Sequence, residues 1–273
     1  MQSFVNEIST VFCEIKPFEF FINYAELDPD SPENILESHF HDRCEIYINV
    51  SGDISYMVEK HLYTLNNGDI VITKPFEYHN CVYNSAKLHR QYCLSFIPEG
   101  NEELFSFINE RLDANGSLVR LTNDRLEEVL ESCNIHQSKE LSQLERYALF
   151  TRILVILGSG TSKEHHDMMP ESIRLATDYI AQNITEQITV ADIARVTHVS
   201  VNTLERHFKE IMGVSPAKYL KNKRLANAAR MLRKGSSVTD ACFDSGFINC
   251  SHFIVQFKKH FGITPNKYRS QTN

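Results

Sequence analysis

The chain has 273 residues, 42% of them hydrophobic, which is long for one domain and sufficient for two domains that each bury a core. Its net charge of −7 argues against a polyanion-binding surface that covers the whole protein. Seven scattered cysteines form no CxxC pair, and no run approaches the roughly 18 apolar residues of a membrane helix, so we expect a cytoplasmic protein with reduced thiols that does not span a membrane.

The first hundred residues predict a β domain. The first ten have neither the basic nor the apolar region of a signal peptide, so none is expected. Short alternating runs recur at residues 45–50, 54–58 and 69–72, with turn residues between them. Many short strands at this spacing predict a sandwich or a barrel over about residues 10–100.

Histidines and a carboxylate recur in this β region. His39, His41 and Glu45 fall on one face of an extended segment, because alternate side chains of a strand point the same way. The HxHxxxE spacing resembles the first cupin motif, and residues 68–79, which end at His79, resemble the second. In cupin enzymes these groups hold a divalent metal inside a small barrel. Hydrogen bonding to a small polar molecule is the other interpretation of the same residues.

Residues from about 101 to 158 predict helices. One apolar stripe contains Leu126, Val129, Leu130 and Cys133, and a second runs from Leu141 to Val155. Stripes of this kind form either ordinary core or, between a sensor and another module, a dimer surface. The sequence leaves both open.

The charge changes sign at the predicted linker, residues 159–170, which has no apolar period. Before Pro170 the chain holds 13 basic and 27 acidic residues, and from Pro170 onward 15 basic and 8 acidic residues. This split predicts that only the last part meets a polyanion.

The last hundred residues contain an internal repeat. Residues 208–219 recur as residues 257–268, with six of twelve positions identical at an offset of 49. Two copies are too few for a solenoid and predict two similar helical units.

Each copy follows the pattern of a helix-turn-helix. Thr189 and Ser237 begin capping boxes, and Ser200 and Asn249 are placed to cap the second helix of each unit. Gly246 supplies the tight turn in the second unit, where the first has His198, which tolerates positive φ only at a cost. A helix over residues 217–233, roughly 26 Å long, would hold two recognition helices about one turn of DNA apart.

These residues resemble the DNA-binding domain of the AraC/XylS transcription-factor family, over about residues 172–270. The resemblance is carried by Arg206-His207-Phe208-Lys209, Gly213-Val214-Ser215-Pro216, Arg224-Leu225, Gly246-Phe247, Phe257-Lys258-Lys259, Thr264-Pro265 and Tyr268-Arg269. It implies DNA contacts by Asn202, Thr203, Arg206 and Lys209 in the first unit and by Cys250, Ser251, His252, Gln256 and Lys258 in the second. Asn and Gln can bond adenine, and Arg can bond guanine. The family often has a basic residue where this chain has Val255. The second unit is therefore expected to bind DNA more weakly or to read its shape.

The resemblance also implies the domain plan and the partners. We expect an α+β chain with a cupin-like sensor and dimerisation domain (1–158), a linker (159–170) and a DNA-binding domain (171–273). The sensor would bind a sugar-like effector, without a cofactor, through His39, His41, Glu45, Tyr47 and His79. Duplex DNA, RNA polymerase and a second copy are the expected partners, and the chain is not expected to be an enzyme. The alternative is a cupin metalloenzyme, an isomerase or dioxygenase, fused to a DNA module, with His39, His41, Glu45 and His79 as metal ligands.

Overall fold

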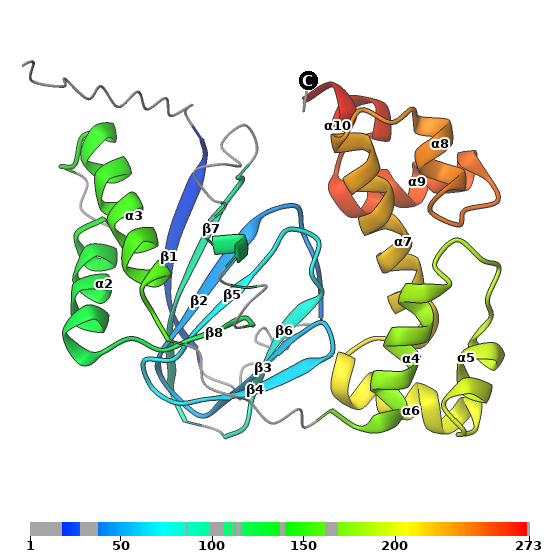
Figure 1. The fold of residues 1–273 in the computed structure, drawn as a ribbon, viewed down its shortest axis with the longest axis horizontal. Coiled ribbons are helices and arrows are strands. Elements are labelled where there is room, and N and C mark those ends of the chain that lie inside the picture. The colour runs from blue at the N-terminus through cyan, green and yellow to red at the C-terminus, as the bar shows by residue number, and fades with distance from the viewer. Residues whose placement is uncertain are drawn as a thin grey trace, which may run out of the picture.

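The computed structural model describes residues 18–27, 38–85, 87–98, 106, 108–110, 112, 116–136, 140–161 and 169–271. Antiparallel sheets with helices α2 and α3 come first, and an all-helical domain follows (Figure 1). The predicted α+β class is therefore confirmed. Parts of the predicted barrel and helices and most of the predicted linker, at residues 10–17, 28–37, 101–105 and 162–168, lie outside the described residues.

The strands form two sheets. The larger has the order β1-β7-β2-β5-β8 and the smaller the order β4-β3-β6. Their bounds are β1 Phe20–Leu27, β2 Cys44–Ser51, β3 Ile54–Val58, β4 His61–Leu65, β5 Ile70–Thr73, β6 His79–Tyr83, β7 His89–Phe96 and β8 Leu118–Val119. Alternate side chains of β2 point into two different cores. Ile46 and Ile48 lie in the core shared with the sensor helices, whereas Tyr47 packs with Tyr56 of the smaller sheet.

Helices α2 (Asn123–His136) and α3 (Gln143–Gly158) contribute to that first core, with Val129, Phe150 and Ile153 fully buried. The predicted stripe on α3 does not face inward as a whole, because Leu144 is 79% exposed and Val155 is 56% exposed. Strand β8 interrupts the region predicted as helical. It pairs with β5 over only two residues, too few to leave a period in the sequence.

Seven further helices build the C-terminal domain in the described part of the chain. They are α4 Glu171–Gln182, α5 Val190–Val196, α6 Val201–Met212, α7 Pro216–Arg233, α8 Val238–Phe243, α9 Cys250–Phe261 and α10 Pro265–Gln271. All four predicted N-caps are confirmed, since the side chains of Thr189, Ser200, Ser237 and Asn249 each accept a first-turn amide. No helix within the described ranges is long and apolar enough to cross a membrane.

Helix α7 organises this domain. It has 18 residues and is therefore roughly 27 Å long, and the two helix-turn-helix units, α5–α6 and α8–α9, lie at its opposite ends (Figure 1). The core of this domain continues into the sensor, because Phe40, Met57, Phe76 and Tyr78 pack in the same cluster as Phe208 and Phe257. The sensor is thus packed against α7 through a shared apolar core.

The two predicted turns differ in strain as the sequence indicates. Both residues have positive φ, 57° at His198 and 82° at Gly246. A Cβ atom at Gly246 would lie 2.4 Å from the backbone oxygen of Ile184, so glycine is required there for space as well as for conformation.

We predict opposite effects of substitution at these two equivalent turns. His198→Gly relieves left-handed strain and raises the free energy of unfolding by about 1 kcal/mol. Gly246→Ala adds both strain and a clash with backbone, and lowers it by about 2 kcal/mol or more. Urea unfolding of the full chain measures both. A destabilised His198→Gly would show that the His198 side chain stabilises the turn.

Candidate functional site

Four groups predicted from separate motifs meet in the sensor. His39, His41, Glu45 and His79 each offer a ligand atom, and these atoms all lie within 4.8 Å of one another. His39 and His79 are joined by backbone hydrogen bonds in both directions, which fixes the two motifs side by side. The sequence prediction that these side chains share one site is met by this arrangement.

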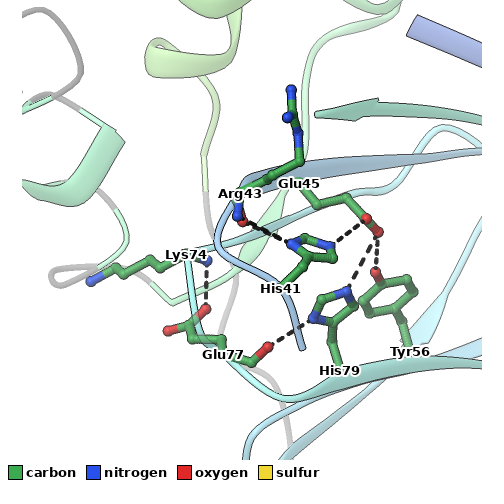
Figure 2. A network of polar contacts seen from close by, with 7 residues as sticks. All are labelled: His41, Arg43, Glu45, Tyr56, Lys74, Glu77 and His79. Carbon is green, nitrogen blue, oxygen red and sulfur yellow. Dashed lines mark hydrogen bonds and ion pairs between the residues drawn. The ribbon is translucent and has the colours of Figure 1, made fainter. Parts of the chain in front are cut away.

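Glu45 lies at the centre of the polar contacts (Figure 2). Its Oε2 is 3.0 Å from Nε2 of His41, and its Oε1 accepts a hydrogen bond from the Tyr56 hydroxyl at 3.0 Å. Burial raises the pKa of Glu45, but the hydrogen bond from His41, the nearby His79 and the hydrogen bond from Tyr56 together lower it to about 2. The site therefore holds a carboxylate at neutral pH.

His79 is buried with one nitrogen unsatisfied. Its Nδ1 lies 2.9 Å from the carbonyl oxygen of Glu77, which can only accept, so Nδ1 carries the proton (Figure 2). The Nε2 atom then presents a lone pair, has no hydrogen-bond partner and lies 3.8 Å from Oε1 of Glu45. Burial lowers the pKa of His79 to about 4, although Glu45 opposes this. A neutral acceptor facing a carboxylate requires a hydrogen-bond donor or a cation between them.

The donor set fits two kinds of ligand. A molecule with several hydroxyl groups could donate to His79 Nε2 and to Glu45 at once. A divalent transition metal also suits three imidazoles and one carboxylate, and the Nδ1 bond of His79 gives the orientation that metal-bound histidines have.

Tyr47 forms its hydrogen bond outside the group of histidines and Glu45. Its hydroxyl donates to Oε1 of Gln91 at 2.7 Å, inside the buried cluster between the sheets. Tyr56, from β3, occupies the position beside Glu45 instead. The alternation along residues 54–58 marks Tyr56 as inward-facing, but only the pairing of the sheets decides which tyrosine meets Glu45.

The segment that supplies two of the histidines also contacts the DNA-binding domain. Between His39 and His41, the ring of Phe40 stacks on His260 of α9, with centroids 4.2 Å apart. Asp42 accepts a hydrogen bond from the Tyr268 hydroxyl at 3.0 Å, and its backbone oxygen accepts from Arg233 at 3.0 Å. Sequence alone gave no indication of these contacts.

A second segment, at Tyr78 and His79, likewise contacts both the cluster and the DNA-binding domain. His79 faces the cluster, whereas the neighbouring Tyr78 packs edge-on against Tyr219 of α7, with centroids 4.9 Å apart. Glu59 accepts hydrogen bonds from the Tyr78 amide and, at 2.8 and 2.9 Å, from Nζ of Lys223. Arg230 of α7 lies over the ring of Phe76, 5.5 Å from its centroid.

The backbone at this junction is strained. In the described part of the chain, three residues other than glycine have positive φ, namely Glu59, Phe76 and His198. Two of the three, Glu59 and Phe76, contact residues of α7. Such conformations persist where the surrounding contacts over-determine them and are frequent at functional sites.

The first recognition helix, α6, exposes most of its predicted contact residues. Asn202, Arg206 and Lys209 are exposed, and Arg206 forms an ion pair with Glu210 at 3.2 Å. Thr203 is instead engaged at the cap, where its hydroxyl lies 2.8 Å from Ser200 Oγ. An exposed ion pair contributes little to stability, so Arg206 can exchange Glu210 for DNA at small cost.

The second recognition helix, α9, is different in chemistry. Ser251, His252 and Lys258 are exposed, but Val255 is also 62% exposed. Cys250 packs partly against the domain core, and Gln256 accepts a hydrogen bond from Lys221 of α7 at 3.4 Å. Gln256 and Cys250 are therefore less exposed than the other residues predicted to contact DNA from this helix.

Comparison with known proteins identifies the class of the helical domain. A helix-turn-helix domain family matches residues 193–271, that is, most of α5 and all of α6–α10. The HTH-type transcriptional activator RhaS of Escherichia coli O139:H28 is 24% identical over 257 residues, which cover 89% of this chain and 91% of RhaS. This relative therefore extends through the sensor as well as the helical domain.

Solved structures include two similar chains. A transcriptional regulator with an AraC-type DNA-binding domain from Chromobacterium violaceum is 33% identical and covers 37% of this chain and 91% of its own, with a TM-score of 0.36. ToxT from Vibrio cholerae O395 is 14% identical and covers 93% of this chain and 98% of its own, with a TM-score of 0.41.

The buried histidine predicts a loss of stability in acid. Burial lowers the pKa of His79 from its ordinary value of 6.5 to about 4 in the folded chain. The unfolded state binds more protons between these values, so the free energy of unfolding falls as pH drops through this window, by on the order of 2 kcal/mol.

Burial raises the pKa of Glu77 to about 7, which acts in the opposite direction, so variants must be compared. His79→Gln removes the titrating group and should flatten the acid loss relative to the unmodified chain, measured by urea unfolding at about pH 4.5 and 7. The exposed His252→Gln is the control. Identical pH dependence in all three proteins would contradict the assignment.

Proposed function

The chain belongs to the AraC/XylS family of DNA-binding transcriptional regulators, and we propose that a small polar effector bound at the sensor cluster controls its DNA binding. The observation that carries the effector site is the unsatisfied Nε2 of His79 beside the Glu45 carboxylate. A carbohydrate is the effector class implied by the family resemblance, and its hydroxyl groups match this donor requirement. The related proteins are transcription regulators, and we propose no catalysis for this chain.

The two units take unequal parts in DNA reading. In the first, Asn202 and Arg206 are exposed side chains able to bond adenine and guanine edges. In the second, the exposed Val255 supports contact with thymine methyl groups or shape reading, and Lys258 supports contact with phosphate. We propose that the first unit sets sequence specificity and that the second anchors and orients the domain.

The contacts between the sensor and the DNA-binding domain support coupling between effector binding and DNA binding. The histidine cluster and the sensor's contacts with the DNA-binding domain share residues 39–42 and 76–79. An effector that favours one backbone arrangement of these segments therefore favours one placement of α7, and the same free energy appears in DNA affinity.

We also propose a homodimer surface, contact with RNA polymerase and a cytoplasmic location. Exposed Leu144 and Val155 on α3 support a homodimer surface on the sensor. The activator name of the relatives supports contact with RNA polymerase. The free cysteines of the described residues support a cytoplasmic location.

A divalent metal at the same cluster is the second candidate. The specific observation in its favour is that four suitable ligand atoms lie within 4.8 Å of one another. His39, His41, Glu45 and His79 would hold the ion, which would supply the positive charge that Glu45 and His79 Nε2 lack. Such a metal could serve as the regulatory signal itself.

Removing two charges from α6 tests the DNA assignment. The double variant Arg206→Ala, Lys209→Ala should bind a site selected from random DNA more weakly, and the slope of log affinity against log salt should fall by about 2. Fluorescence anisotropy at several salt concentrations measures both.

The matched control is Lys87→Ala, Arg90→Ala, which removes two exposed charges from the sensor. It should leave affinity and slope almost unchanged. Unchanged values in the α6 variant would show that this helix is not in the groove.

Metal analysis of the full chain, purified without chelator, decides between effector and metal at the cluster. Under the effector proposal we expect less than about a tenth of an equivalent of Fe, Mn, Zn or Ni. About one equivalent, lost in His79→Gln, would contradict it and establish the second candidate.

A further inference from the structure

The turn of the second helix-turn-helix unit is one residue longer than the turn of the first. Val199 and Phe247 occupy equivalent places, because the amide of each donates to the carbonyl oxygen five residues earlier, at 3.3 and 3.1 Å. In the first unit the cap of the recognition helix, Ser200, directly follows Val199. In the second unit the cap is Asn249, so Ile248 is an added residue that has no counterpart in the first.

The added residue is an exposed isoleucine. Val199 and Phe247 both pack against the core of the domain, whereas the Ile248 side chain is 77% exposed. An apolar residue directly before a helix cap often packs on the fourth helical residue, which is here the fully buried Phe253. Because Ile248 stays in water instead, it contributes little to the stability of the turn, and its apolar surface is available to a partner.

Ile248 lies at the end of α9 that is expected to reach the bases. In a helix-turn-helix, the N-terminal residues of the recognition helix contact base edges in the major groove. Ile248 precedes the first helical residue, Cys250, by two positions. It also lines, together with His252 and residues 187–190 at the start of the first unit, a groove of about 630 Å³.

The chemistry of this side chain selects the part of DNA that it can recognise. Isoleucine has no hydrogen-bonding atom, so it cannot read the donors and acceptors of the base edges. The methyl group of thymine is the apolar group that base pairs present in the major groove. Removal of that methyl group and of the Ile248 side chain from water is favourable.

We propose that Ile248 contacts the methyl group of a thymine and gives the second unit a base preference that the first unit lacks. This rests on the proposed binding of α9 in the major groove, and it adds a residue and the base that it recognises. A single methyl contact discriminates less than a bidentate hydrogen bond does. The second unit therefore remains the weaker reader of the two.

Deoxyuridine, which lacks the methyl group of thymine, tests this contact without changing the base pairing. Each thymine of a site selected from random DNA is replaced in turn, and the affinity of the full chain is measured by fluorescence anisotropy. We expect replacement of at least one thymine to weaken binding by the unmodified chain about fourfold. Ile248→Ser should lose about as much affinity for the thymine site and should no longer respond to that replacement.

The matched control is Ile135→Ser, which makes the same change at a residue of α2 that is 42% exposed. It should respond to deoxyuridine as the unmodified chain does. Ile248→Leu keeps an apolar side chain and should retain most of the response.

Three results would overturn the proposal. The first is an unmodified chain that tolerates every replacement, and the second is an Ile248→Ser variant that keeps the full response at every thymine. The third is an equal loss of affinity of Ile248→Ser for selected and unrelated DNA, together with a lower free energy of unfolding in urea. Ile248 would then stabilise the domain instead of reading a base.

The α6 variant Arg206→Ala, Lys209→Ala separates this proposal from the proposed function. If it weakens binding while Ile248→Ser keeps the full deoxyuridine response, only the assignment of Ile248 fails. If it leaves affinity and salt slope unchanged while Ile248→Ser loses the response, the first unit is the part wrongly assigned. A chain that enriches no DNA site at all overturns both proposals.

Discussion

The division of neighbouring side chains between the sensor cluster and the DNA-binding domain, along two short backbone segments, is the constraint on which the rest of this structure depends. Within residues 39–42, the histidines turn toward Glu45, and Phe40 and Asp42 turn toward the DNA-binding domain. Tyr78 and His79 repeat the division on the neighbouring segment. Neighbouring residues of these short segments are joined by one backbone, so a shift on the cluster side also shifts the contacts with the DNA-binding domain. The positive φ of Phe76 and Glu59 shows that this backbone is held under strain.

The sensor contacts α7, and the position of α7 sets the position of both helix-turn-helix units. Helix α7 joins the two helix-turn-helix units, so any tilt of α7 relative to the sensor moves both recognition helices together (Figure 1). The units themselves are unequal. The first has Arg206 on an exposed face but a strained turn at His198, whereas the second has the relaxed Gly246 turn but presents the apolar Val255. The proposed division into a reader and an anchor, at the two ends of one helix, suits control by placement of the domain as a whole.

Sequence predicted the local features and missed the long-range ones. Helix caps such as Ser200 and Asn249 lie within three residues of the amides they satisfy, so their signal is local. The metal-like spacing of His39, His41 and Glu45 follows from a period of two. The exchange of Tyr47 for Tyr56 depends on sheet pairing, and the Glu59 to Lys223 contact spans 164 residues, so neither leaves a pattern in the chain. Gln256 stays a predicted DNA contact, but its hydrogen bond with Lys221 could not be predicted, because the helix phase alone does not show that α7 lies beside it.

A double-mutant cycle on DNA affinity tests most directly whether the histidine cluster and the contacts between the two domains are energetically coupled. His79→Gln perturbs the cluster and Asp42→Asn weakens the hydrogen bond to Tyr268, with DNA binding of the single and double variants measured at one salt concentration. If the shared segments couple the two sites, the effects should depart from additivity by about 0.5 kcal/mol or more. Additive effects, within about 0.3 kcal/mol, would contradict this coupling. They would show that the cluster and the sensor's contacts with the DNA-binding domain act independently.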